Sequence, residues 1–145
     1  GVKYVFLGRE LGARSDDPDC YEAGQVQYDR LARTQQFQTG IDRLVRGAAK
    51  EAIAVTCVER DPLDCHRTLL VAAQLVLRGA TVGHILPDGR IESHDDAMFR
   101  LRSLHGLAEA DLFHSATELT AEAMDRQESR IAYVDTALAA GRGYR

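Results

Sequence analysis

Residues 52–86 read AIAVTCVERDPLDCHRTLLVAAQLVLRGATVGHIL, and this stretch decides the predicted fold. Its first part, Ala52–Val58, is apolar on both faces of a pleated strand, which is typical of a strand covered on both sides in a parallel sheet. A helix is predicted to follow, because Asp61 can cap its start and Gly79 lies just past its end. Residues 81–86 predict a second strand. We therefore expect a βαβ unit inside an α/β fold, with a mostly parallel sheet and helices on both faces.

The segments on either side of this stretch predict further strands and helices. Val2–Leu7 is rich in β-branched and aromatic residues and is followed by a glycine, so we expect a strand there. Apolar residues at helical spacing predict one or two helices over residues 25–47, divided at Gly40. Ser93, with an acidic residue three positions later, is expected to cap another short helix after a turn at residues 87–89.

The chain of 145 residues, 45% of them hydrophobic, is long enough for one domain with its own core. We expect an α/β domain over residues 1–108 and a helical extension over residues 109–145. One long helix, capped at Ser115 and ending at Gly141, is predicted to make up this extension. It carries no chemistry in this interpretation and is expected to serve for docking or for a homodimer.

Composition and terminal sequence exclude several classes of protein. No apolar run is long enough to cross a bilayer, and no signal peptide opens the chain, so we expect a cytoplasmic protein without membrane contact. A net charge of -4 argues against a surface that binds duplex nucleic acid. The chain starts at Gly1, without methionine and directly inside a predicted strand. We therefore expect that this sequence is part of a longer protein or that an upstream segment has been removed.

Two of the three cysteines lie close together, and the second is followed directly by His66 and Arg67. An odd number of cysteines without a secretion signal argues against a disulfide framework and favours reactive or metal-bound thiols. Cys57 is predicted to end a strand, and Cys65, His66 and Arg67 to lie at the start of the next helix. These side chains are therefore expected at the carboxyl edge of the sheet, where open α/β folds bind ligands.

The leading hypothesis is an intracellular enzyme that uses Cys57 or Cys65 as a thiolate nucleophile. The N-terminus of a helix and nearby arginines lower the pKa of a thiol and attract anions. His66 would act as acid or base, and Arg67 would hold an anionic group of a small molecule or nucleotide. This hypothesis includes no metal and names no cofactor.

Three residues outside this block are further candidates for binding the substrate. Arg9 and Arg14 lie in a loop with two glycines that follows the first predicted strand. If that strand is parallel to the central one, this loop opens on the same edge as Cys57. His94 follows a turn and starts a predicted helix, which places it within reach of the same edge.

Two other hypotheses remain open. In the first, Cys57, Cys65 and His66 bind zinc or iron together with His84 or His94, although His84 lies inside a strand and is expected to be a hydrogen-bonded core residue. In the second, the chain is a non-catalytic module for a nucleotide or for single-stranded nucleic acid. Arginines would then contact phosphates, and three tyrosines would stack on bases, namely Tyr4, Tyr21 and Tyr28.

The order and spacing of these blocks resemble those of a known family. The blocks are Leu7-Gly8-x-Glu10-Leu11-Gly12-x-Arg14, Tyr28-x-x-Leu31-Ala32-x-Thr34-x-x-Phe37 with Gly40-Ile41, Cys57-x-Glu59-x-Asp61-Pro62-x-x-Cys65-His66-Arg67, His84-Ile85-x-x-Asp88-Gly89, and His94. Over about residues 2–105 the chain is similar to the family called domain of unknown function 488.

The resemblance implies a fold and a set of motif positions, but no reaction. The motif positions that it implies are Arg14, Cys57, Glu59, Cys65, His66, Arg67 and His94, and Glu59 is thereby added to the residues expected to contact substrate. Members of this family usually begin with a further strand, helix and strand, which the present chain lacks. We therefore expect two strands and part of the site to lie outside this sequence.

Overall fold

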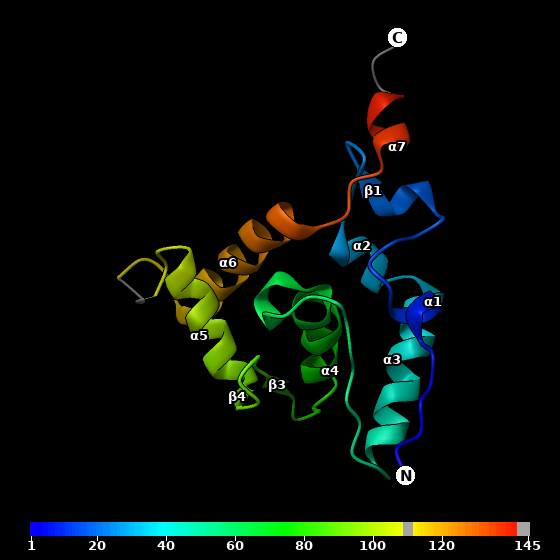
Figure 1. The fold of residues 1–145 in the computed structure, drawn as a ribbon. Helices are drawn as coiled ribbons and strands as arrows, with labels where there is room; N and C mark the ends of the chain where they lie inside the picture. The colour runs from blue at the N-terminus through cyan, green and yellow to red at the C-terminus, as the bar shows by residue number, and fades with distance from the viewer. Residues whose placement is uncertain (109–111, 142–145) are drawn as a thin grey trace. The chain divides into compact units, whose positions relative to one another are not determined.

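We describe the protein from a computed structural model, which places residues 1–108 and 112–141 (Figure 1). The chain divides into two compact units. The first consists of residues 1–54 together with the chain from Ala132 onward, and the second consists of residues 55–131. Residues 109–111 and 142–145 of the predicted helical extension lie outside the described part of the chain.

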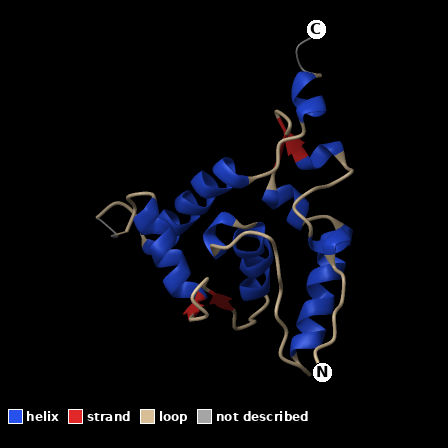
Figure 2. Ribbon diagram, viewed as in Figure 1, coloured by secondary structure: helices blue, strands red, loops and turns tan. Residues whose placement is uncertain are grey.

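The first unit is mostly helical, with two very short strands (Figure 2). Its elements are α1 (Gly8–Leu11), a 3-10 turn (Pro18–Cys20), β1 (Tyr21–Glu22), β2 (Gln25–Val26), α2 (Tyr28–Ala32), α3 (Gln35–Ala48) and α7 (Thr136–Ala140). The strands β1 and β2 pair antiparallel. The segment before α7 joins them through a bridge between Gln25 and Val134.

Helix α3 supplies much of the core of the first unit. Thr34 caps it by accepting a hydrogen bond from the backbone N–H of Phe37 at 3.3 Å. Phe37, Ile41 and Leu44 all lie on its buried face. The helices predicted over residues 25–47 are confirmed, but the division predicted at Gly40 is wrong. The break lies at Thr34 instead, because a capping side chain starts a new helix there.

The second unit contains the stretch that the sequence singled out. Its elements are a 3-10 turn (Pro62–Asp64), a π-helical segment (Arg67–Ala72), α4 (Ala73–Leu77), β3 (Gly83–Ile85), β4 (Ile91–Ser93), α5 (His94–Leu104) and α6 (Ala116–Ile131). Helix α5 packs against α6. Apolar residues from both helices and from the π-helical segment form the core, namely Leu69, Leu70, Val71, Ala97, Leu101, Leu119 and Ala123.

The predicted caps at Ser93 and Ser115 are confirmed, and Ser93 accepts from the N–H of Asp96 at 3.1 Å. Asp61 accepts from the N–H of Leu63 at 2.9 Å, but it caps only the 3-10 turn, because the helix begins later, at Arg67, without a side-chain cap. Ser115 and Glu118 satisfy each other's backbone N–H groups in a capping box. Each cap depends on residues two or three positions apart, so the local sequence determines it.

The predicted parallel sheet is wrong for the described residues, whose strands form two antiparallel pairs. The predicted strand over residues 81–86 is present as β3, but its partner is β4 rather than a strand near residue 55. A short turn joins β3 to β4, and Gly89 has a φ of 85° in it. Closing this turn costs less chain entropy than a crossover connection, so the local antiparallel pair forms.

The other two predicted strands, residues 2–7 and 52–58, have no strand hydrogen bonds. The apolar run of residues 52–58 was expected to be covered on both faces, yet Val55 is 41% exposed and Val58 is 91% exposed. An apolar run does not distinguish a buried strand from an extended segment without a neighbour. Because the described residues form no parallel sheet, the predicted arrangement of helices on both of its faces is wrong as well.

The prediction of a single long C-terminal helix is also wrong. Helix α6 ends at Ile131 and α7 begins after Asp135, whose carboxylate accepts from the N–H groups of Ala137 and Leu138. Between them, the N–H of Asp135 donates to the carbonyl oxygen of Gly24 at 2.7 Å. The chain leaves the helix there because its backbone groups bond to the short strands of the first unit.

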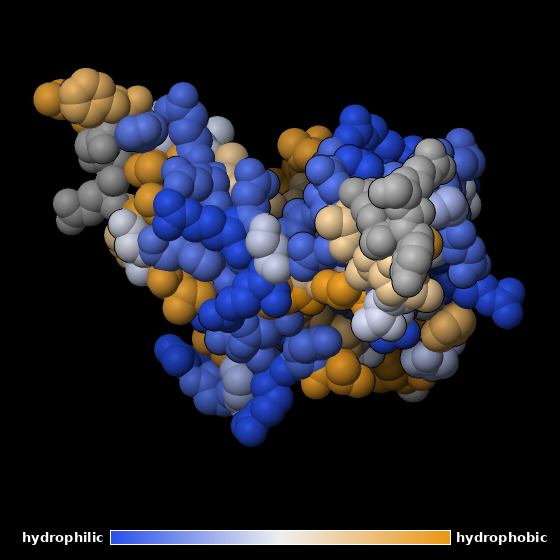
Figure 3. All heavy atoms as spheres, turned by 90° about the horizontal axis from the view of Figure 1, so that it is seen from above, coloured by the Kyte–Doolittle hydropathy of each residue, from blue (hydrophilic) through white to orange (hydrophobic). Residues whose placement is uncertain are grey.

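Within residues 1–108 and 112–141, no helix has the length and apolar character needed to cross a membrane. Hydrophobic side chains nevertheless interrupt the hydrophilic surface, as the face in Figure 3 shows. The exposed hydrophobic residues include Val2, Tyr4 and Phe6 in the extended N-terminal segment and Ile85 and Ile91, which are cross-strand neighbours in the second unit.

Gly40 is predicted to be intolerant of a side chain. A Cβ atom at this position would lie 2.7 Å from Glu10 Cβ and 2.7 Å from Leu11 Cδ2, so it would push α1 away from α3. We expect Gly40→Ala to lower the free energy of unfolding by about 1–3 kcal/mol in urea denaturation. Gly47→Ala in the same helix is the matched control, because its Cβ would meet only the end of the Ile53 side chain. Equal stability of the two variants would contradict this prediction.

Candidate functional site

The candidate site lies where an extended segment approaches the start of the π-helical segment. Cys57 lies in this extended segment, whereas Cys65 and His66 lie between the 3-10 turn and the π-helical segment. The N–H of Cys65 donates to the carbonyl oxygen of Pro62 at 3.3 Å, and its own carbonyl oxygen accepts from Thr68 at 3.1 Å. The expected position at the carboxyl edge of a parallel sheet is therefore wrong, and the site is built at a helix start.

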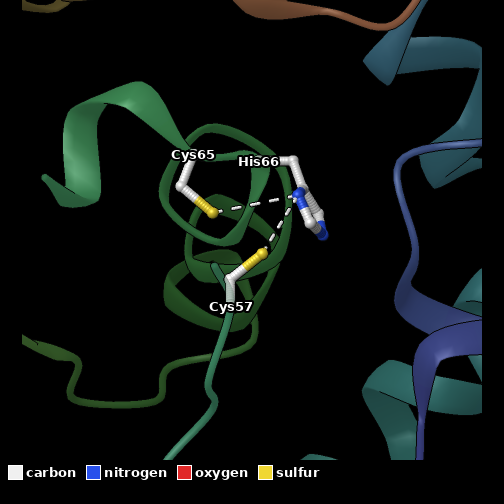
Figure 4. Close-up of side chains that lie close together, drawn as sticks. All are labelled: Cys57, Cys65 and His66. Atoms are coloured by element: carbon white, nitrogen blue, oxygen red, sulfur yellow. Dashed lines mark hydrogen bonds between the residues drawn. The ribbon is translucent and has the colours of Figure 1, made fainter. Parts of the chain in front are cut away.

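Both thiols face the same imidazole nitrogen (Figure 4). The Nδ1 atom of His66 lies 4.0 Å from Cys57 Sγ and 3.8 Å from Cys65 Sγ. All three ligand atoms lie within 4.8 Å of one another. Cys65 is 1% exposed, whereas Cys57 is partly exposed, so solvent reaches the cluster on the Cys57 side.

Glu59 and Arg67 surround the two sulfur atoms. The thiol of Cys65 donates to Glu59 Oε2 at 3.3 Å, and the backbone N–H of Arg67 donates to Cys65 Sγ at 3.4 Å. The guanidinium of Arg67 donates to the carbonyl oxygen of Glu59 at 3.0 Å. The structure thus brings together five of the predicted site residues, namely Cys57, Glu59, Cys65, His66 and Arg67.

The surroundings shift the pKa values of the Cys65 thiol and of the Glu59 carboxyl group in opposite directions. Burial raises the pKa of the Cys65 thiol above its ordinary value, so this thiol is protonated at neutral pH in the metal-free protein. The pKa of Glu59 is lowered, mainly because its carboxylate accepts a hydrogen bond from the Cys57 thiol. Glu59 is therefore ionised beside two sulfur atoms, and the buried neutral Cys65 thiol needs a base to remove its proton before its sulfur can attack.

Arg9 and Arg14, which were predicted to bind the same anion, lie in the first unit. They line a pocket of about 270 Å³ together with Gly12, Ser15 and Thr34. The guanidinium of Arg14 lies over the ring of Tyr133, 4.1 Å from the ring centroid. Their part in the site of the second unit stays a prediction.

His94 does not join the sulfur cluster. It is the first residue of α5, and its Nδ1 atom lies 3.0 Å from His84 Nε2. His84 also lies 3.4 Å from the hydroxyl of Thr68, which confirms it as a buried, hydrogen-bonded histidine. Among the described residues, the group of close metal-ligand atoms that includes the two cysteines contains neither His84 nor His94, which are paired with each other instead.

Two residues that support the site were not singled out from the sequence. Arg100 on α5 forms ion pairs with Asp61 at 3.0 Å and with Glu92 at 2.8 Å. Gln127 on α6 has 0% exposure, and its amide donates to the carbonyl oxygen of Leu63 at 2.9 Å. Both bonds fix the turn before Cys65. Asp61 lies 39 positions from Arg100 and Leu63 lies 64 positions from Gln127, so no local pattern indicates them.

The tyrosines proposed to stack on nucleotide bases are mostly buried. Tyr21 is 6% exposed and Tyr28 is 4% exposed, so neither ring presents a free face. The hydroxyl of Tyr21 instead donates to the carbonyl oxygen of Ser15 at 2.9 Å. The prediction that Tyr21 and Tyr28 stack on bases is therefore wrong, because their rings are buried in the core of the first unit.

The pair formed by His84 and His94 predicts acid sensitivity. Burial, and then the neighbouring His94, lowers the pKa of His84 to about 4, against 6.5 for an unperturbed histidine. The unfolded chain thus binds a proton at higher pH than the folded chain does. Stability is complete above pH 6.5 and falls as the pH drops toward 4, by about 2 kcal/mol after allowance for solvent screening.

Urea denaturation at several pH values and an NMR titration of His84 check this prediction. We expect the His84 imidazole to titrate with a midpoint near 4, and the wild-type free energy of unfolding to fall between pH 6.5 and 4. His84→Gln is expected to remove most of this slope. A midpoint near 6.5 would contradict the buried position of His84.

One family model matches the chain, over residues 1–74, and its description is domain of unknown function DUF488. No curated protein and no solved structure matches the chain. The matched residues include Arg14 and the whole block from Cys57 to Arg67, whereas His94 lies beyond them. Because this match spans 74 of the 145 residues, the chain belongs to the DUF488 family.

Proposed function

We propose that the second unit binds one zinc ion through Cys57, Cys65 and His66. The observation that carries this proposal is that two sulfur atoms and one imidazole nitrogen lie within 4.8 Å of one another. Two of these ligands are consecutive residues at a helix start, and the third comes from a separate segment. A metal bond would therefore cross-link two parts of the unit.

The distances suit a tetrahedral ion. Zinc lies about 2.3 Å from thiolate sulfur and about 2.0–2.1 Å from imidazole nitrogen, so two ligands separated by the tetrahedral angle lie about 3.6–3.8 Å apart. The sulfur-to-nitrogen distances of 4.0 and 3.8 Å are slightly longer. Ion binding would shorten the sulfur-to-nitrogen distances by a few tenths of an ångström and the sulfur–sulfur distance, now within 4.8 Å, by at most about 1 Å, which a half-buried Cys57 side chain accommodates.

The donor set also favours zinc. Thiolate and imidazole are the ligands that zinc prefers in proteins, and iron is the alternative ion for such a set. The N–H of Arg67 already points at Cys65 Sγ, and such hydrogen bonds support metal-bound thiolates. The Glu59 carboxylate lies 3.3 Å from the same sulfur but outside the group of three close ligand atoms, so it would have to move to supply a fourth ligand.

Zinc titration of the purified chain tests the proposal. We expect one zinc ion per chain, and cobalt in its place should show the absorption of a metal–thiolate bond. Cys57→Ser, Cys65→Ser and His66→Asn each remove one ligand. Each is expected to weaken zinc binding by more than about 100-fold, since loss of a mere supporting partner costs 10- to 100-fold.

Cys20→Ser is the matched control for these variants. Cys20 is also buried and free, but it belongs to the first unit and is not part of the cluster. Its substitution is therefore expected to leave zinc binding unchanged. A wild-type chain that binds no zinc, or an equal loss of zinc in Cys20→Ser, would contradict the metal site.

Thiol catalysis on an anionic substrate is the second candidate function, with Cys57 as nucleophile. The observation that favours it is the partly exposed Cys57 thiol, which lies 4.0 Å from His66 Nδ1. His66 would accept the thiol proton, and Arg67 would hold the anion. In this proposal Arg9 and Arg14 bind anionic substrate as well.

Alkylation of metal-free protein with iodoacetamide separates the three thiols. We expect Cys57 to react faster than Cys65 and Cys20, because both of these are buried and the pKa of Cys65 is raised. Mass spectrometry of tryptic peptides measures each rate. A Cys57 rate no higher than that of free cysteine at neutral pH would contradict an activated nucleophile without affecting the zinc proposal.

A further inference from the structure

We propose that Cys57 and Cys65 form a reversible disulfide when the protein meets a hydroperoxide, and that this bond empties the zinc site. The disulfide itself stands on the geometry of the metal-free thiols. The release of zinc rests, in addition, on the proposed function. The site is thereby assigned a second state, in which its two sulfur ligands bind each other.

The sulfur atoms are close enough for this bond. They lie within 4.8 Å of each other, and a disulfide is about 2.05 Å long, so the sulfurs need to approach by at most about 2.7 Å. Cys65 is held in place by backbone hydrogen bonds of the helix start. In the described chain, the backbone N–H groups of residues 52–60 make no hydrogen bond to other backbone groups. Cys57 is therefore the partner that moves.

The difference in exposure assigns the first step to Cys57. Its sulfur is partly exposed, whereas Cys65 is 1% exposed. His66 Nδ1, 4.0 Å from Cys57 Sγ, is positioned to accept the Cys57 proton. The thiolate attacks one peroxide oxygen: a sulfur–oxygen bond forms, the oxygen–oxygen bond breaks, and the departing alkoxide or hydroxide takes up a proton. Cys57 becomes a sulfenic acid.

Cys65 then resolves this sulfenic acid. Its thiol donates to Glu59 Oε2 at 3.3 Å, so the carboxylate can take the proton as the Cys65 sulfur attacks the Cys57 sulfur. A sulfur–sulfur bond forms, the sulfur–oxygen bond breaks, and the departing hydroxide leaves as water with that proton. In total, two thiols lose two electrons and one hydroperoxide gains them, giving a disulfide, an alcohol or water, and a further water.

The sequence makes the product easy to identify. Trypsin cuts after Lys50, Arg60 and Arg67, so it leaves Cys57 in the peptide of residues 51–60 and Cys65 in that of residues 61–67. Cys20 lies in a third peptide, residues 15–30. A disulfide within the site therefore links two small peptides that are otherwise separate.

The test treats the metal-free and the zinc-loaded chain of residues 1–145 with hydrogen peroxide, blocks free thiols with iodoacetamide, and maps the tryptic peptides by mass spectrometry. We expect the linked pair, lighter than the two free peptides by two hydrogen atoms, and its loss after treatment with dithiothreitol. The Cys65→Ser variant is expected to retain a sulfenic acid on Cys57 that dimedone traps. Cys20→Ser is the control and is expected to behave as wild type.

The possible results distinguish the disulfide proposal from the proposal that the site binds zinc. Absence of the linked pair in metal-free protein, or linkage of Cys20 in its place, overturns the inference. Zinc that stays bound at one ion per chain after full disulfide formation overturns the second part, the emptying of the site. A linked pair in a chain that never bound zinc supports the disulfide and contradicts the proposed function alone.

Discussion

One buried side chain, that of Gln127, holds the base on which the site of the second unit is built. Its amide nitrogen donates to the carbonyl oxygen of Leu63 at 2.9 Å and to the carboxylate of Asp64 at 3.2 Å. Its amide oxygen accepts from His105 Nε2 at 2.9 Å. Because Gln127 has 0% exposure, loss of a partner would leave a polar atom unsatisfied away from water, at a cost of about 1–3 kcal/mol. The turn before Cys65 is thus fixed to α5 and α6.

This anchored turn explains the unequal character of the two cysteines. Arg100 holds Asp61 on one side of the turn, and Gln127 holds Leu63 on the other. Cys65 therefore has a fixed, buried sulfur, with His66 directly beside it in the chain. Cys57 lies in an extended segment and is partly exposed. A metal site needs positioned ligands and thiol chemistry needs an accessible sulfur, and this pair offers one sulfur of each kind.

The sequence predicted correctly the features that depend on hydrogen bonds between residues close together in the chain. Asp61, Ser93 and Ser115 each cap a backbone N–H two or three residues away, and these caps are present. The predicted strands that the structure lacks would have needed partners far away in the sequence. Ala52–Val58 has the composition of a central strand, but a strand requires a neighbour that supplies hydrogen bonds, and no apolar pattern identifies that neighbour.

By itself the sequence determined the family, the caps at Ser93 and Ser115 and the closeness of Cys57, Cys65, His66 and Arg67, because these depend on residues close together in the chain. The tertiary structure alone decided that the strands pair antiparallel and that His94 bonds to His84 rather than to the cysteines. It also decided which sulfur is buried. Pairing and burial depend on which distant groups come into contact, and the free energy of those contacts is a property of the folded chain rather than of any local segment.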